Sequence, residues 1–230
     1  MPFVFDPPAP ATLPVEGGTD LYPVRRIFCV GRNYAAHAAE MGQEVDRSAP
    51  FYFTKSPAAL APSGATLPYA PGTADWHHEM EFVAALGAPA FRTAPDRALA
   101  TVWGYGAGLD MTRRDLQAAA KAKGRPWSLA KDHENSAVLG ALRPAAEWTP
   151  GAQRIRLDVN GETRQDATLD TMVWSLAELI ADLSHYYHLG AGDVIMTGTP
   201  AGVGPVRPGD RLEGHIDGLP PVAMQVGAPL

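Results

Sequence analysis

EMEFVAAL, at residues 79–86, and WGYGAGLD, at residues 103–110, are the two segments that decide the fold. Each is a short apolar or small-residue run without a helical repeat, which is typical of a buried central strand. Around them, glycine (23) and proline (22) make up about a fifth of the 230 residues, against a usual share of roughly 12%. We therefore predict an α+β fold in which short strands dominate a large mixed sheet system.

Shorter elements are expected on both sides of these two strands. Three helices are predicted: one over 34–41, capped by Asn33 and ended by Gly42, and two that open with capping boxes at Thr112–Asp115 and Ser175–Glu178. Asn160-Gly161 is a two-residue hairpin signal. The remaining predicted strands are at 27–30, 51–54, 154–159, 162–165, 194–196, 211–213 and 222–226.

Composition limits the partners and the compartment. The formal net charge of −6 provides no basic field for a polyanion, so nucleic-acid binding is not expected. The sequence has no run of about 18 apolar residues and no basic signal-peptide start. Cys29 is the only cysteine, which indicates a reducing compartment. We expect a soluble, cytoplasmic protein with a Pro/Gly-rich N-terminal arm or small sheet over 1–24 and one main domain over 25–230.

The pattern Glu79-Met80-Glu81 is the first candidate for a functional site. Side chains alternate along a strand, so Glu79 and Glu81 share one face at the mouth of an apolar segment. Like charges so placed need water, protonation or a bridging cation. Oxygen-only ligands suit Mg²⁺, Mn²⁺ or Ca²⁺ rather than zinc. The alternative is an edge strand whose two carboxylates are simply hydrated.

The second segment adds a third carboxylate. Alternation from Trp103 to Asp110 places Gly104, Gly106, Gly108 and Asp110 on one face. Because strand glycines mark places where backbone or ligand comes close, this face reads as a floor left clear beneath a ligand or as a site of tight sheet packing. Three carboxylates on two strands would leave coordination positions open for a chelating substrate.

Several other side chains are candidates for a site. His37 and Glu40 lie three apart on the first helix, so a carboxylate-held imidazole could activate water; a solvated helix face fits as well. Lys131 could stabilise oxyanion charge and Gln117 could donate to a substrate oxygen, although a surface lysine and an exposed glutamine give the same patterns. The polar residues 43–48 suggest a mobile loop beside the first helix.

The segment TGTPAGVG, residues 197–204, is a tight loop rich in free N–H groups, which can hold carboxylates. It lacks the lysine of a phosphate-binding loop. His77 and His78 have no zinc-site spacing, so we assign them to supporting contacts. The sequence has no Gly-x-Ser-x-Gly motif, and Cys29 lies inside an apolar strand as a buried structural thiol.

These motifs, taken in order, resemble the fumarylacetoacetate hydrolase family over roughly residues 25–226. The resemblance implies a mixed β-roll or β-sandwich, usually a homodimer, with a Mg²⁺ or Mn²⁺ site. The motifs that carry it are Gly31-Arg-Asn-Tyr-Ala-Ala-His-Ala-Ala-Glu-Met41, Phe53-Thr-Lys55, Glu79-Met-Glu81, Gly104-Tyr-Gly-Ala-Gly-Leu-Asp110 with Arg114-Asp-Leu-Gln117, Leu129-Ala-Lys131, Val159-Asn-Gly161, and Gly192–Gly204.

The resemblance also implies roles for individual residues. It makes Glu79, Glu81 and Asp110 the metal ligands, and His37 with Glu40 the pair that activates water. It adds Lys131 as a catalytic cation. The substrate contacts that it implies are Arg32, Lys55, Gln117 and Thr199, and the basic partners considered for the far end of the substrate are Arg32, Arg113 and Arg114.

Within the family the chain looks most like the acylpyruvases. The expected reaction is hydrolysis of a C–C bond in a 2,4-dioxo acid, with fumarylpyruvate giving fumarate and pyruvate. An oxaloacetate decarboxylase or an isomerase of unsaturated 2-oxo acids would use the same enolate chemistry without attack by water. A metal-stabilised binding domain without catalysis is the alternative from another class.

Overall fold

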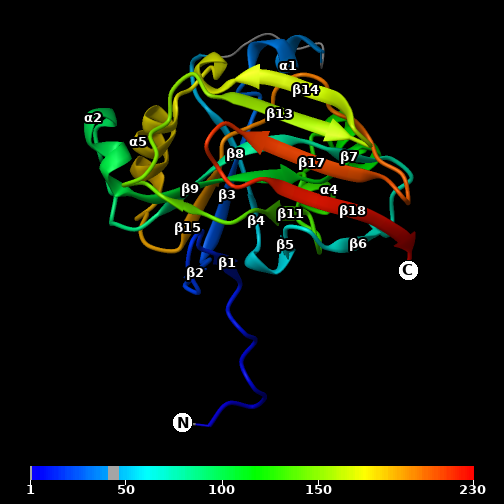
Figure 1. The fold of residues 1–230 in the computed structure, drawn as a ribbon, viewed down its shortest axis with the longest axis horizontal. Coiled ribbons are helices and arrows are strands. Elements are labelled where there is room, and N and C mark those ends of the chain that lie inside the picture. The colour runs from blue at the N-terminus through cyan, green and yellow to red at the C-terminus, as the bar shows by residue number, and fades with distance from the viewer. Residues whose placement is uncertain (1, 41–46) are drawn as a thin grey trace.

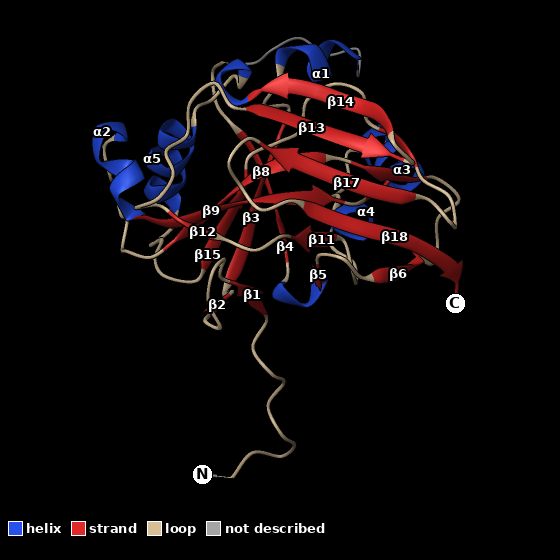
Figure 2. Cartoon of the chain, in the orientation of Figure 1, coloured by secondary structure: helices blue, strands red, loops and turns tan. Residues whose placement is uncertain are grey.

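A computed structural model describes residues 2–40 and 47–230. Strands form most of the regular structure and the helices are short (Figure 1), as the colouring by secondary structure in Figure 2 makes plain. The predicted α+β class with a mixed sheet system is therefore confirmed. None of the helices in the described ranges is long and apolar enough to cross a lipid bilayer.

The largest sheet carries the two decisive segments as neighbours. Strand β8 (Met80–Leu86) pairs antiparallel with β9 (Val102–Asp110). The sheet order is β4-β3-β15-β8-β9-β11-β5, with β12 added beside β9. The β15–β3 and β11–β5 pairs are parallel, which makes the sheet mixed. The further strands are β3 (Arg26–Gly31), β4 (Phe51–Lys55), β5 (Leu60–Pro62), β11 (Ala137–Leu139), β12 (Arg143–Pro144) and β15 (Asp193–Met196).

A second sheet packs over the first, with the order β14-β13-β17-β18-β6. Its β13–β14 hairpin turns at Asn160 and Gly161, whose φ angles of 53° and 81° fit the predicted two-residue turn. Two small sheets complete the fold. The strands of these three sheets are β6 (Thr66–Tyr69), β13 (Arg154–Val159), β14 (Glu162–Thr168), β17 (Arg211–Ile216), β18 (Val222–Pro229), β7 (Trp76–His78), β10 (Thr112–Arg113), β16 (Gly204–Pro205), β1 (Thr12–Pro14) and β2 (Leu21–Pro23).

The helices lie at the margins of the sheets. They are α1 (Ala35–Glu40), α2 (Pro95–Ala98), α3 (Arg114–Ala122), α4 (Ser128–Lys131) and α5 (Leu176–Tyr186), with 3₁₀ turns at Pro57–Ala59, Leu99–Thr101 and Leu169–Thr171. The predicted capping box at Ser175 and Glu178 opens α5. Ahead of β1 the chain extends away from the body of the molecule (Figure 1).

Two of the predicted helix caps are wrong. The side chain of Asn33 donates to the carbonyls of Trp174 and Thr197 and accepts from the Trp174 N–H, so it ties three segments together instead of capping α1. Thr112 belongs to β10, and α3 begins at Arg114 without a side-chain cap. The predicted helix end at Met41 and Gly42, and residues 43–46 of the loop predicted to be mobile, lie outside the described residues.

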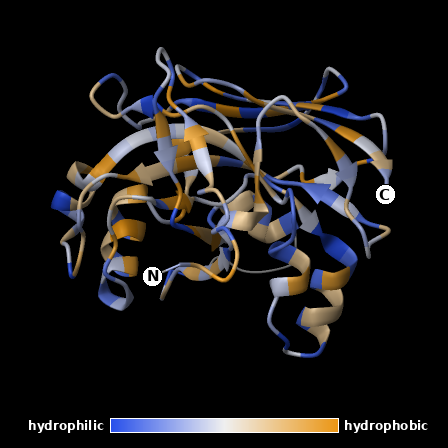
Figure 3. Ribbon diagram, turned by 90° about the horizontal axis from the view of Figure 1, so that it is seen from below, coloured by the Kyte–Doolittle hydropathy of each residue, from blue (hydrophilic) through white to orange (hydrophobic). Residues whose placement is uncertain are grey.

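The first sheet buries both of its faces. Phe82 and Ala84 of β8 point into a large core shared with the second sheet and with α5. Val83 and Ala85 point the other way, into a smaller core that includes Cys29. Figure 3 shows hydrophobic and hydrophilic residues interleaved along the strands and helices, as this two-sided arrangement requires. The side chains of Glu79, Glu81 and Asp110 point to the same side of the sheet as the smaller core and lie at its end.

The glycine face of β9 is a packing surface, and the prediction of a floor left clear beneath a ligand is wrong. A Cβ on Gly104 would lie 2.7 Å from the carbonyl oxygen of Arg143. A Cβ on Gly108 would lie 2.5 Å from Leu139 Cδ2. The segment 139–143 thus covers the glycines. On this face, the end at Asp110 is the part left for a functional site.

We predict that Gly104→Ala lowers the free energy of unfolding by about 1–3 kcal/mol, because a backbone oxygen cannot rotate away from the new methyl group. Urea denaturation measures this. Gly190→Ala is the control, since a Cβ there meets no atom within 4 Å, and its stability should change by less than about 0.5 kcal/mol. Unaltered stability with lost activity in Gly104→Ala would instead support the ligand floor.

Candidate active site

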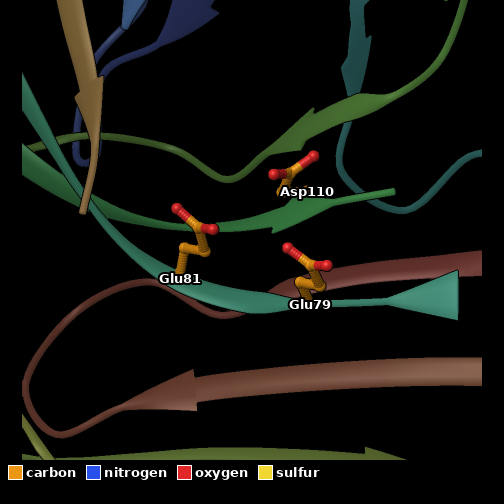
Figure 4. A group of neighbouring side chains, drawn as sticks. All are labelled: Glu79, Glu81 and Asp110. Atoms are coloured by element: carbon orange, nitrogen blue, oxygen red, sulfur yellow. The ribbon is translucent and has the colours of Figure 1, made fainter. Parts of the chain in front are cut away.

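Three carboxylates converge where β8 and β9 lie side by side. Glu79 immediately precedes β8, Glu81 lies within it, and Asp110 is the last residue of β9. One oxygen from each of the three lies within 4.8 Å of the others, and all three side chains rise from the same face (Figure 4). Their residues are at most 5% exposed. Strand alternation in the two quoted segments thus produces the cluster that the sequence suggested.

Three cationic side chains surround these carboxylates. Lys131 donates to Glu79 and Asp110, both at 2.7 Å, and uses its third proton on Thr112 Oγ1. Arg114 lies 2.5 Å from the other oxygen of Glu79. The ammonium of Lys55 is 2.9 Å from Asp110 Oδ1. Buried charges of one sign are tolerated here because opposite charges are packed against them.

The two glutamates differ sharply in electrostatics. Burial alone would raise the pKa of Glu79, but the charges of Lys131 and Arg114 outweigh it and hold that pKa well below its usual range. Burial raises the pKa of Glu81 well above its usual range, and the charges of Asp110 and Glu79 add to the effect. Glu81 receives one hydrogen bond from the Gly198 N–H and, in the described part of the chain, no ion pair. Glu81 is therefore the carboxylate that lacks a compensating cation.

The donor set fits a hard divalent ion. It contains carboxylate oxygens only, which Mg²⁺, Mn²⁺ and Ca²⁺ prefer. A cation near Glu81 would relieve its desolvation and its repulsion from Asp110 and Glu79. Asp110 Oδ1 is buried, with the ammonium of Lys55 as its charged neighbour at 2.9 Å. These observations fit the metal site that the motifs imply.

A histidine–carboxylate pair faces the same pocket from α1. His37 Nδ1 lies 3.3 Å from Glu40 Oε2, and His37 is buried. Glu40 also accepts from the Gly202 N–H. The loop 197–204 therefore holds two carboxylates, Glu81 through Gly198 and Glu40 through Gly202. The carboxylate-binding role expected of this loop is thus filled by side chains of the protein itself.

A small pocket opens between the acidic cluster and α1. Its wall includes the predicted residues Arg32, His37, Gln117, Lys131 and Thr199 beside Glu79 and Glu81. Gln117 accepts from Arg114 with its amide oxygen, so its NH₂ group is the part that can donate to a ligand. Lys55 is not part of this wall, because it lies fully buried beneath Asp110.

The histidines before β8 have supporting contacts, as expected. His78 Nδ1 lies 3.2 Å from Gln165 Oε1, and the Gln165 amide donates to Thr199 on the pocket wall. Burial lowers the pKa of His78 to about 4, so this imidazole is neutral at physiological pH. Cys29 is fully buried, and burial raises the pKa of its thiol, which agrees with a structural role.

The sequence interpretation missed the helical side of the pocket. Lys121 and Trp127 line it but were not singled out, and Arg114, considered only for the far end of the substrate, binds Glu79 instead. The spacing of Arg114, Gln117 and Lys121 was the available signal, because residues three, four and seven apart share one helix face. That stripe could not be recognised as functional until Asp110 was known to lie beside it.

Comparisons with known proteins place this chain in a family. A family model described as fumarylacetoacetate (FAA) hydrolase C-terminal matches residues 26–227. A fumarylpyruvate hydrolase from a Ralstonia species is 49% identical over 189 residues, covering 81% of this chain and 98% of that protein. An oxaloacetate tautomerase of Escherichia coli (strain K12) is 41% identical over 199 residues, covering 86% of this chain and 90% of that protein.

A solved structure is similar over nearly the whole chain. It is the fumarylpyruvate hydrolase from Pseudomonas aeruginosa in complex with Mn²⁺ and pyruvate. The TM-score is 0.96 at 43% sequence identity, with 99% of this chain and 100% of that chain covered. The chain belongs to the fumarylacetoacetate hydrolase family, as its ordered motifs predicted.

Proposed function

We propose that this protein is a divalent-metal-dependent hydrolase that cleaves a C–C bond of a 2,4-dioxo acid, with fumarylpyruvate as the substrate and fumarate and pyruvate as the products. One observation carries the proposal: a buried cluster of three carboxylates and a histidine–carboxylate pair open on one pocket. The similarity to two fumarylpyruvate hydrolases, one bound to Mn²⁺ and pyruvate, supports the choice of substrate.

In this proposal Glu79, Glu81 and Asp110 hold Mg²⁺ or Mn²⁺. A bound divalent ion supplies Lewis-acid polarisation of the carboxylate and 2-oxo oxygens of the substrate. Lys55 fixes the orientation of the Asp110 carboxylate from below through an ion pair, and Arg114 does the same for Glu79. The carboxylates are thus held in fixed positions before the substrate binds.

His37 acts as the general base. Glu40 accepts from Nδ1–H and so leaves Nε2 free to take a proton from water. The resulting hydroxide adds to the C4 carbonyl carbon, and the C3–C4 bond breaks with its electron pair passing to C3. Fumarate leaves with the added oxygen, and the enolate of pyruvate takes up the proton at C3.

Three further residues of the pocket wall take part in the proposed reaction. Lys131 places a buried positive charge beside Glu79 and Asp110, where it stabilises the enolate that forms on bond cleavage. Gln117 donates its NH₂ group to a substrate oxygen, and Thr199, held by Gln165, provides a hydroxyl on the opposite wall. The homodimeric state and the cytoplasmic location stay predictions from the sequence.

Oxaloacetate tautomerisation is the second candidate, because a relative of that activity is 41% identical to this chain. It needs only proton transfer at C3 of a 2-oxo acid, without attack by water. The decarboxylase and isomerase alternatives use the same enolate. All of these reactions depend less on a water-activating imidazole than hydrolysis does.

A substrate screen with Mg²⁺ or Mn²⁺ present tests the assignment. Fumarylpyruvate and acetylpyruvate should be hydrolysed with release of pyruvate, and chelation of the metal should abolish turnover. Oxaloacetate is the comparison substrate. Its tautomerisation is measured by the absorbance of the enol, and its decarboxylation by the release of pyruvate. Turnover of oxaloacetate alone would replace the hydrolase proposal with the second candidate, and no turnover of any 2-oxo acid would favour a binding domain.

We predict that His37→Ala lowers kcat for fumarylpyruvate by at least about 100-fold, the usual contribution of general-base catalysis. The rise in melting temperature on adding Mn²⁺ should be retained, since His37 is not among the proposed ligands. His185→Ala, on the exposed face of α5, is the control and should keep normal turnover. Undiminished hydrolysis in His37→Ala would exclude the proposed base.

We predict that Glu81→Gln removes the metal response of the protein. In the parent, a hundredfold excess of Mn²⁺ over its Kd should raise the melting temperature by about 5–10 °C. The variant should lose this shift. Without metal it should be at least as stable as the parent, because an amide has no charge to desolvate.

Glu162→Gln, exposed on the β13–β14 hairpin, is the matched control for this charge change and should keep the full metal shift. A full Mn²⁺ shift in Glu81→Gln as well would place the ion elsewhere.

A further inference from the structure

The acidic pocket continues into a second pocket, and the two form one cleft. The outer pocket lies between β4 and the segment from Gly124 to Ser128 that connects α3 with α4. The residues common to both walls are Arg32, Phe53, Lys121, Trp127 and Lys131. An elongated ligand held at the acidic cluster can therefore extend outward past these five residues.

Two cations at this junction have no anionic partner in the described part of the chain. No carboxylate of residues 2–40 or 47–230 forms an ion pair with Arg32 or Lys121. The pKa of Lys121 is lowered, first by burial and then by the charges of Arg114 and Arg32. Two positive charges without an ion-pair partner among the described residues thus lie together at this point of the cleft, which favours binding of an anion.

Both cations are held in place by aromatic rings. Lys121 Nζ lies 4.9 Å from the ring centroid of Trp127, and the guanidinium of Arg32 lies 5.3 Å from that of Phe51. Arg32 also has a φ of 61°, a left-handed conformation that costs free energy for any residue with a Cβ. The aromatic contacts hold the two charges at the junction in advance of ligand binding.

Arg113 and Arg114 are engaged elsewhere, and Arg125 lies farther out, on the wall of the outer pocket alone. Arg114 is bound to Glu79 and Gln117 inside the inner pocket. Arg113 donates to the Leu129 carbonyl and lines neither pocket. Of the three arginines considered from the sequence for the far end of the substrate, only Arg32 lies on the path outward.

We propose that Lys121, with Arg32 beside it, binds a carboxylate at the far end of the acyl group and so selects 2,4-dioxo acids whose acyl chain is itself an acid. This inference rests on the proposed function, which places the α-keto acid end of the substrate at the acidic cluster. The distal carboxylate then lies outward in the cleft, where Phe53 and Trp127 contact the planar unsaturated chain between the two ends.

The test compares two substrates that differ at the far end: fumarylpyruvate, which has a distal carboxylate, and acetylpyruvate, which has none. Lys121→Met keeps an unbranched side chain against Trp127 but removes the charge. We expect kcat/KM for fumarylpyruvate to fall about 10- to 100-fold, the loss expected for a charge-assisted hydrogen bond. The value for acetylpyruvate should change less than about threefold.

Three further variants make the result specific. Lys121→Arg should retain most of the preference for fumarylpyruvate. Arg32→Asn removes the second charge while keeping a residue that tolerates positive φ, and it should also weaken the preference. Lys123→Met loses the same charge two residues away, on an exposed residue that lines neither pocket, and should behave as the parent.

Equal losses on both substrates in Lys121→Met, or no loss on either, would overturn the inference while leaving the hydrolase proposal intact. A parent protein that hydrolyses neither acylpyruvate would instead overturn the proposed function. Thermal unfolding of each variant separates a folding defect from a binding defect, and Arg32→Asn gives the answer if Lys121→Met does not fold.

Discussion

The burial of three carboxylates at one end of a sheet face is the constraint on which the rest of the site depends. Removing a carboxylate from water costs several kcal/mol unless partners compensate. Lys131, Arg114 and Lys55 compensate Glu79 and Asp110, and each comes from a different segment. Among the described residues Glu81 is bound by a backbone N–H alone, and burial, with the charges of Asp110 and Glu79, raises its pKa. The cluster is therefore electrostatically prepared for one more cation.

The fold delivers the remaining groups by a few specific links. Asn33 joins the start of α1 to the carbonyls of Thr197 and Trp174, so the helix that carries His37 is tied to the loop beneath it. That loop binds Glu81 at one end and Glu40 at the other. One short stretch, residues 197–204, thus sets the position of the proposed base relative to the acidic cluster. The opposite wall comes from α3, which follows Asp110 closely in the chain.

The comparison of sequence and structure separates local patterns from long-range ones. Strand alternation placed Glu79, Glu81 and Asp110 on corresponding faces, and the hairpin at Asn160-Gly161 and the cap at Ser175 were also predicted. The errors concern residues whose partners are distant in sequence. Asn33 has the composition of a cap but bonds to residues 141 and 164 positions away. The glycines of β9 make room for the segment 139–143, which no local pattern could place above them.

By itself the sequence determined most of the longer strands, the parity of the acidic residues and the family, because these depend on short-range periodicity and on motifs of fixed order. Only the tertiary structure decided which charges neutralise one another and which do not. Lys55 lies beneath Asp110 rather than on the pocket wall, and Lys121 lies at the junction of the two pockets. The physical reason is that desolvation and ion pairing depend on distances between segments, and chain packing alone sets those distances.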